Sequence, residues 1–220
     1  MISSTADMAR YLQMILNGGE LDGTRLISAD SLREMHTPRI TRPERGSPFG
    51  DAGYGYGWQI TPDFLGHRVV EHGGSVLTAT SHMAVVPDAG LGIVVLANGA
   101  GYPMNQLAFY GLAEALGRDP EALPFVQRAR HMTALGGIYR TYHDTMTFRV
   151  TPAGDLLHVN EVGSWYDERT IPLLPESVGA QESRFYVQAS GVKMPVVFTD
   201  RDGTLEMLYG RYLFRKVGEL

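Results

Sequence analysis

The sequence predicts an α+β fold, in which an antiparallel sheet flanked by helices is followed by a small all-β, barrel-like domain. Helical periodicity and helix-capping signals are confined to the first half of the chain, where they surround several β-type runs. Beyond it, only short β-type runs separated by turn signals occur. We therefore expect one domain at residues 1–118, a linker at 119–133 and a small β-domain at 134–220.

Three helices are expected in the first domain. The first begins after Ser4, where the Ser-Thr-Ala-Asp sequence fits a capping box, and its apolar side chains recur at helical spacing as far as Leu16. The second has Ser28 as its N-cap and ends before Pro38, because proline disfavours helical geometry at the preceding residue. Pro103 is well placed to open the third helix.

The strands of both domains follow from alternating apolar runs between turn residues. After a surface loop at residues 39–53, four strands are expected near residues 54–60, 68–73, 79–87 and 91–98. In the β-domain, turn signals recur at roughly the 8–12-residue spacing of barrels and sandwiches, which predicts seven or eight strands. We expect side chains to fill the interior of this small barrel.

Composition excludes several function classes. Of the 220 residues, 44% are hydrophobic and 20% charged, as in a globular protein. The net charge of -5 and the lack of basic runs argue against a nucleic acid or an anionic membrane as partner. There is no cysteine, and the seven histidines lack metal-ligand spacing, so no metal and no cofactor are expected. No apolar run approaches the roughly 20 residues of a membrane span, and residues 1–20 lack a signal-peptide pattern, which leaves the compartment unassigned.

Four segments carry a family resemblance. They are Ser3–Leu12, Tyr54–Trp58, Glu71–Ser75 and Pro87–Asn98. In this order and spacing they resemble class C β-lactamase-like and penicillin-binding-protein-like serine hydrolases, in particular the D-aminopeptidase and esterase branch. The resemblance covers residues 2–116 and implies the C-terminal half of the catalytic domain, with a partial β-lactamase/transpeptidase-like fold. The β-domain loosely resembles the lipocalin-like domains that follow the catalytic domain in several members.

The candidate site is the sequence His72-Gly73-Gly74-Ser75, which stands where this family carries its third motif. Gly73 and Gly74 would let a substrate backbone approach the strand closely, because they have no side chain to block it. The resemblance implies that the backbone N–H of Ser75 is an oxyanion-hole donor and that His72 assists proton transfer or holds a substrate carboxylate. The alternative is a half-buried strand histidine next to a bulge or turn. We interpret the aromatic residues of Tyr54–Trp58 as packing.

The other motifs that the resemblance implies are missing from the sequence. The family nucleophile is the serine of a Ser-x-x-Lys motif at the start of a helix. The only literal match, Ser190 to Lys193, lies in the β-domain and contains a glycine and a valine that suit a helix start poorly, so we interpret it as a decoy. No Tyr-x-Asn, Ser-x-Asn or Gly-x-Ser-x-Gly sequence occurs.

Two functional hypotheses follow. In the first, the chain is part of a serine hydrolase that cleaves amide or ester bonds of a small acyl, peptide or ester substrate through an acyl-enzyme. It is then expected to be inactive alone, and its partner is an N-terminal half that supplies nucleophile and base, or further copies of itself. In the second, it is a non-catalytic binding or scaffold module that retains the hydrolase sheet and a ligand- or partner-binding barrel. The first predicts a Ser-x-x-Lys segment that co-purifies with the chain.

Overall fold

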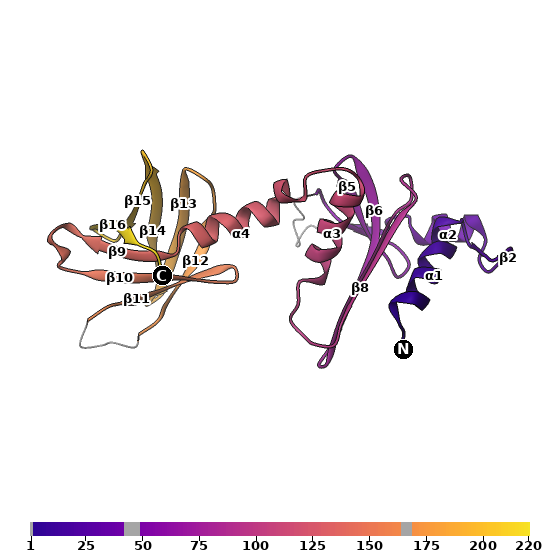
Figure 1. Ribbon diagram of the computed structural model, residues 1–220, viewed down its shortest axis with the longest axis horizontal. Helices are drawn as coiled ribbons and strands as arrows, with labels where there is room; N and C mark the ends of the chain where they lie inside the picture. Colours follow the sequence, from indigo (N-terminus) through magenta and orange to yellow (C-terminus); the bar gives the residue numbers. More distant parts are fainter. Residues whose placement is uncertain (1, 42–48, 164–168) are drawn as a thin grey trace. The chain divides into compact units, whose positions relative to one another are not determined.

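The computed structural model describes residues 2–41, 49–163 and 169–220. The chain divides into two compact units, Met1–Leu123 and Pro124–Leu220, which are described separately below. The first contains an antiparallel sheet with helices, and the second a closed barrel (Figure 1). The predicted α+β class, with a barrel after the sheet, is therefore confirmed.

The helices of the first unit begin where their capping residues predict. They are α1 (Thr5–Leu16), α2 (Ala29–Met35) and α3 (Met104–Ala115). The Ser4 side chain accepts a hydrogen bond from the backbone N–H of Asp7, and the Ser28 side chain accepts one from the N–H of Ser31. Each of these bonds satisfies a donor of the first helical turn that has no partner within the helix. The η2 turn (Pro120–Ala122) closes the unit.

The sheet of the first unit has six strands in the order β3-β4-β5-β6-β7-β8, all antiparallel. A separate two-stranded ribbon precedes α2 in the sequence. The strands of the ribbon and the sheet are β1 (Glu20–Leu21), β2 (Thr24–Arg25), β3 (Ile40–Thr41), β4 (Gly53–Tyr54), β5 (Gln59–Phe64), β6 (His67–Val76), β7 (Ala79–Val86) and β8 (Leu91–Ala97).

The prediction of one strand near residues 54–60 is wrong in one respect. The strand is interrupted, because β4 ends at Tyr54 and β5 begins at Gln59. Gly57 has a φ of 78° in the turn between them, a conformation that glycine adopts without steric cost. The loop expected at 39–53 contains β3 and the start of β4, and its residues 42–48 lie outside the described residues.

Helices cover both faces of the six-stranded sheet. Gly92 of β8 lies against Leu12 of α1, whereas the next residue, Ile93, lies against Gly111 of α3. Because successive strand residues point to opposite faces, α1 and α3 lie on opposite sides, as Figure 1 shows. The core on the α1 side contains Leu12, Ile15, Leu32, Trp58, Ile60, Val70 and Val85.

The second unit is an eight-stranded closed barrel preceded by the helix α4 (Pro124–Ala134). Each strand pairs antiparallel with both neighbours, in the order β10-β11-β12-β13-β14-β15-β16-β9. The strands are β9 (Gly137–Thr141), β10 (Thr147–Ala153), β11 (Leu156–Glu161), β12 (Ile171–Ser177), β13 (Glu182–Ala189), β14 (Val192–Arg201), β15 (Thr204–Tyr209) and β16 (Tyr212–Gly218), with the short η3 turn (Tyr142–Asp144) between β9 and β10. Residues 119–133, expected as a linker, thus contain η2 and most of α4.

Inward-pointing side chains pack the barrel. They form one core cluster, which Met132 of α4 joins, so the helix docks onto the barrel. The Tyr139 hydroxyl donates to the carbonyl oxygen of Leu135 at 2.9 Å, and burial raises the pKa of Tyr139 well above its ordinary value. Packing of this kind agrees with the expectation that side chains fill the interior. The cluster consists of Met132, Leu135, Tyr139, Phe148, Val150, Leu157, Val159, Leu173, Phe185, Val187, Val196, Phe198, Met207 and Phe214.

Among the described residues, no helix combines the length and the apolar character needed to cross a membrane.

Candidate functional site

Strand β6 carries the candidate site on a segment that is paired along only one edge. The pairing of β5 with β6 ends at Gln59 and Glu71, whereas β6 stays paired with β7 as far as Val76. In the described part of the chain, residues 72–76 therefore have a strand neighbour on the β7 side alone. Their exposure follows this change, because residues 69–71 are buried and residues 73–76 are exposed. This segment is called the free edge of β6 below.

The pairing pattern determines where the backbone groups of the free edge point. Val76 and Ala79 pair across a two-residue turn, so they form a hydrogen-bonded pair. Hydrogen-bonded and non-hydrogen-bonded pairs alternate in an antiparallel ladder, which places Ser75 opposite Thr80 and Gly73 opposite His82 at non-hydrogen-bonded positions. The N–H and C=O groups of Ser75 and Gly73 therefore point away from β7, toward the unpaired side.

His72 is half-buried and points to the same face of the sheet as Val70, two residues earlier, which is the α1 face. Its Nε2 atom lies 3.0 Å from the hydroxyl oxygen of Tyr54. The two rings meet edge to face, with centroids 6.0 Å apart. Either group can donate in this hydrogen bond, depending on the tautomer of the imidazole. The Tyr54 hydroxyl therefore fixes the orientation of the ring.

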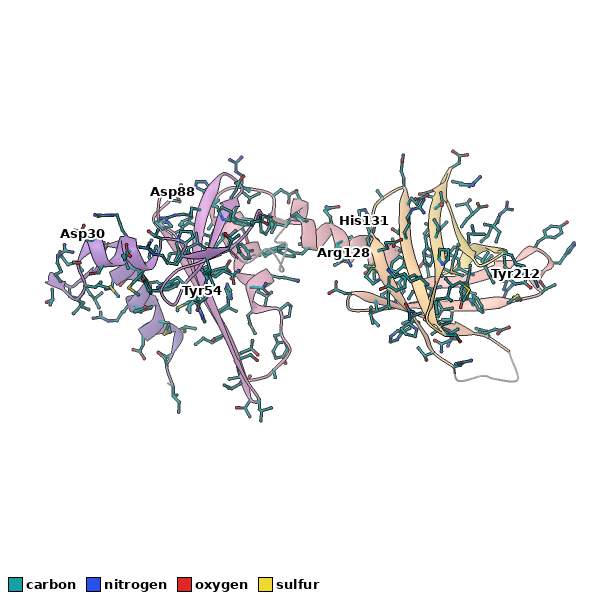
Figure 2. All side chains as sticks on the ribbon, turned by 180° about the vertical axis from the view of Figure 1, so that it is seen from behind. Asp30, Tyr54, Asp88, Arg128, His131 and Tyr212 are labelled. Atoms are coloured by element: carbon teal, nitrogen blue, oxygen red, sulfur yellow. The ribbon has the colours of Figure 1, made fainter. Side chains whose placement is uncertain are left out.

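Tyr54, labelled in Figure 2, is a site residue that the sequence interpretation missed. The sequence interpretation assigns the aromatic residues of Tyr54–Trp58 to packing. Packing is indeed the role of Trp58, which is buried against Tyr11 and His36. Tyr54 differs because its hydroxyl contacts His72, 18 residues further along the chain. No periodicity in the sequence could predict this contact, since it depends on the turn between β4 and β5.

A buried polar network lies on the opposite face of β6, directly behind the free edge. The Glu71 carboxylate contacts Nε2 of His82 at 2.8 Å and accepts a hydrogen bond from the Thr61 hydroxyl at 2.6 Å. Glu71 is 2% and His82 7% exposed, so both side chains are largely withdrawn from water. The network joins β5, β6 and β7 at the point where β5 stops pairing, and it holds the free edge in place. No motif in the sequence indicates this network.

Gly73 stands directly across from His82 in this arrangement. A Cβ atom at Gly73 would lie 3.0 Å from the Nδ1 atom of His82, so the position is too close for a side chain unless the imidazole moves. Gly74 would meet the Ser81 hydroxyl at 3.1 Å in the same way. The two glycines therefore serve the packing of the β6–β7 hairpin as well as leaving its outer edge open.

A hollow of ≈ 830 Å³ lies over the β6–β8 end of the sheet. Its lining combines the sequence-predicted site residues with the beginning of the chain, and Met8 of α1 contributes to one wall. The lining residues are Ile2, Ser3, Met8, residues 72–76, residues 78–83, Val94 and residues 96–98. The structure therefore brings His72, Gly73, Gly74 and Ser75 together at one concave surface.

The Ser190–Lys193 match has none of the geometry of a nucleophile motif. Ser190 lies in the turn between β13 and β14 with a φ of 50°, and not at the start of a helix. The Lys193 ammonium lies 4.3 Å from the centroid of the Tyr186 ring. Within the described ranges, no three His, Cys, Asp or Glu side chains gather into a group that could hold a metal ion.

The sheet, its helices on both faces and the glycine-bearing strand with a free edge define a β-lactamase-like fold. A family model described as Beta-lactamase matches residues 1–117. The chain belongs to this family, which confirms the resemblance found in the sequence. A second model, the Pab87 octamerisation domain, matches residues 120–215.

The chain is also similar to solved structures. The octameric penicillin-binding protein homologue from Pyrococcus abyssi is 35% identical with a TM-score of 0.83, over 97% of this chain and 47% of that chain. The present chain thus spans about half the length of this relative. Structures of SurE and of SurE with D-Leu are 18% and 19% identical, with TM-scores of 0.37 and 0.31, over 98% and 87% of this chain and 48% and 44% of theirs. A comparison with curated proteins found no match.

Proposed function

We propose that residues 1–117 form the substrate-pairing half of a serine hydrolase active site that cleaves amide or ester bonds through an acyl-enzyme. The observation that carries this proposal is the free edge of β6, along which the Ser75 N–H points outward beside His72. Backbone N–H groups aimed at a developing negative charge are the usual elements of an oxyanion hole. Fold and family membership support the serine hydrolase class.

Each predicted site residue has a distinct role in this proposal. The acyl chain of the substrate lies along the free edge of β6 and pairs with the outward backbone groups of Gly73, where neither Gly73 nor Gly74 has a side chain to block its approach. The Ser75 N–H donates to the carbonyl oxygen while it carries negative charge in the tetrahedral intermediate. His72, oriented by Tyr54, transfers a proton or binds a carboxylate of the substrate. The nucleophilic serine and its lysine come from a Ser-x-x-Lys segment outside these 220 residues, so the chain alone is inactive.

The proposed substrates are small acyl compounds, peptides or esters, with D-amino-acid peptides as the first class to test. Two observations support this choice. The third motif carries a histidine instead of the more common lysine, as the peptidase and esterase branches of the family do. The hollow of ≈ 830 Å³ beside His72 has the size of sites for small ligands.

The backbone donor can be tested by removing one N–H. A Ser75→Pro variant lacks it, whereas the matched Ser75→Ala variant keeps the N–H and loses only the hydroxyl. Because this N–H points away from β7, proline removes no ladder hydrogen bond. Each variant is co-expressed with a polypeptide that carries the Ser-x-x-Lys segment, and hydrolysis of nitrophenyl esters and D-amino-acid amides is measured. We expect kcat to fall by about 10²–10³-fold for Ser75→Pro and to change little for Ser75→Ala.

Two outcomes contradict the proposal. Equal activity of Ser75→Pro and Ser75→Ala would exclude the N–H as an oxyanion donor. Intact-mass spectrometry after treatment with a fluorophosphonate provides the second test, since this probe modifies activated serines. An adduct on the purified chain alone would show that it contains its own nucleophile, and Ser190 would be the first residue to examine. No adduct is expected.

We also propose that the barrel unit associates copies of this chain. The support is the match of residues 120–215 to the Pab87 octamerisation domain and the similarity to an octameric protein. As far as the structure describes it, the barrel is closed and its core is packed, so its outer surface is the part available to a partner. Sedimentation velocity should show a species several times heavier than the 24.2 kDa chain.

A scaffold function is the second candidate, because the only Ser-x-x-Lys sequence lies in a β-turn. In that case the sheet and barrel assemble with a partner and perform no chemistry. The two candidates differ in one result of the co-expression experiment. Hydrolysis that depends on the Ser75 N–H supports the hydrolase, whereas a stable complex without turnover supports the scaffold.

A further inference from the structure

The outward-facing side chains of the barrel differ between its two walls. Inward and outward residues alternate along each strand, so cross-strand pairs line up in rows on the outer surface. On the wall formed by β10 and β11, Arg149 pairs with Asn160 and Thr151 pairs with His158. Their neighbours Val150, Leu157 and Val159 are fully buried in the core, which places these four polar side chains outside. This wall has the polarity expected of a water-exposed surface.

The opposite wall, formed by β14, β15 and β16, carries an apolar row instead. Leu208 pairs with Val197 on one side and with Leu213 on the other. Leu208 is 44% and Leu213 45% exposed, while the adjacent Met207 and Phe214 are fully buried inside. Pro195, two residues before Val197 and on the same face, is also exposed. Pro195, Val197, Leu208 and Leu213 are called the leucine band. Tyr212, labelled in Figure 2, is the first residue of β16, the strand that carries Leu213.

A cluster of one acidic and two basic side chains borders the leucine band. Glu206 pairs with Arg215 across β15 and β16, and its carboxylate contacts the Arg215 guanidinium at 3.0 Å and that of Arg201 at 3.2 Å. The Glu206 side chain is only 9% exposed, so its charge is already satisfied within the barrel. An apolar centre with a polar border is the usual composition of a protein–protein contact surface.

We propose that the leucine band is the surface through which the barrels of two copies of this chain contact each other. This inference rests on the proposed self-association and specifies its location. Within the described residues every barrel strand is already paired on both sides, which leaves no strand to which a second copy could add one. They must therefore meet through side chains. An apolar band is complementary to an identical band, as a symmetric contact between two copies requires.

The test is a double substitution that replaces the apolar pair by an ion pair. Leu208→Lys/Leu213→Glu makes the band polar and keeps opposite charges directly across two strands, so the barrel is not strained by repulsion. The matched control is Thr151→Lys/His158→Glu, which changes a directly opposed outward pair on the polar wall. Sedimentation velocity over a concentration series should show smaller species for the band variant, with a dissociation constant raised by at least about 100-fold. The control should assemble like the unchanged chain.

The possible failures are distinguishable. An unchanged chain that sediments as a monomer at all concentrations overturns the proposed self-association and this inference together. An assembled unchanged chain with an equally assembled band variant overturns only the leucine band. If the band variant and the control dissociate equally, the leucine band is likewise overturned as the contact surface. Circular dichroism of each variant establishes that the barrel is folded.

A second measurement needs no disruptive change. Because the chain contains no cysteine, Leu208→Cys and Thr151→Cys each introduce a single thiol. In the assembled protein, the thiol at position 208 should react with a maleimide at least about ten times more slowly than the thiol at position 151. Dilution to the monomer should remove the difference. Equal rates in the two assembled variants would overturn the proposed location.

Discussion

Acidification from pH 6.5 to about 4 should destabilise the first unit through His36. This residue follows α2, is 5% exposed and packs edge to face against the Trp58 ring. Its Nε2 atom is buried without a hydrogen-bond partner among the described residues. Burial, and secondarily the nearby Arg68 guanidinium, lowers the pKa of His36 from 6.5 to about 4. The folded unit therefore holds this imidazole neutral.

The size of the effect follows from this pKa difference. The folded state binds fewer protons than the unfolded state between pH about 4 and 6.5, so stability decreases as the pH falls through this window. The contribution of His36 is fully present above 6.5, is lost progressively between 6.5 and about 4, and changes no further below that value. A shift of about 2.5 units corresponds to roughly 3 kcal/mol of unfolding free energy.

Urea denaturation at several pH values in this window measures the loss. A Trp165→Phe background leaves Trp58, which contacts His36, as the single fluorescent tryptophan. His36→Phe keeps an aromatic ring but cannot bind a proton, so its unfolding free energy should fall with pH by roughly 3 kcal/mol less than in the background. Arg68→Met should reduce the loss only slightly, because burial is the larger cause. The same pH dependence in His36→Phe as in the background would refute the reasoning.

Three further substitutions test other parts of the structure by urea denaturation. Glu71→Ala should destabilise the first unit by about 3–5 kcal/mol, because it leaves the buried His82 without its partner. The double variant Glu71→Leu/His82→Phe replaces both polar side chains by apolar ones and should destabilise the unit clearly less. Gly55→Ala should cost about 1–3 kcal/mol, since the new Cβ would lie 2.1 Å from the Met35 carbonyl oxygen; full stability would mean that the two segments are not so close. Phe198→Ala should destabilise the barrel by about 3–5 kcal/mol, and a loss below 1 kcal/mol would contradict a packed interior.

The helix starts could be predicted because their causes are local. The side chains of Ser4 and Ser28 each cap a backbone N–H three residues away, so the sequence contains both partners of the interaction. Helix α4 was not predicted as a helix, because it follows a proline- and charge-bearing stretch and itself begins with a proline. Its stability depends on Met132 in the barrel core, a tertiary contact that no local pattern contains.

The site could be predicted only in part for the same reason. His72 to Ser75 were identified because four segments in family order marked their place in the chain. Tyr54 and the Glu71–His82 pair were not, because each contact joins two strands whose register the sequence does not specify. A one-residue shift of β7 against β6 would move His82 to the other face of the sheet and separate the pair.

A single turn accounts for both the free edge and the position of Tyr54. Between β4 and β5, the Gly55 N–H donates to the Trp58 carbonyl at 2.8 Å, and the Tyr56 N–H donates to the Met35 carbonyl at 3.0 Å, which ties the turn to the end of α2.

Because the chain is held in this turn until Gln59, β5 cannot pair with β6 beyond Glu71. An unpaired edge normally invites unwanted strand pairing, and glycines with low β-propensity weaken that tendency here. The same turn ends β4 at Tyr54, whose hydroxyl then reaches His72. One local conformation thus leaves backbone donors unpaired and places a tyrosine beside the histidine next to them, which is the combination that the proposed hydrolase chemistry requires.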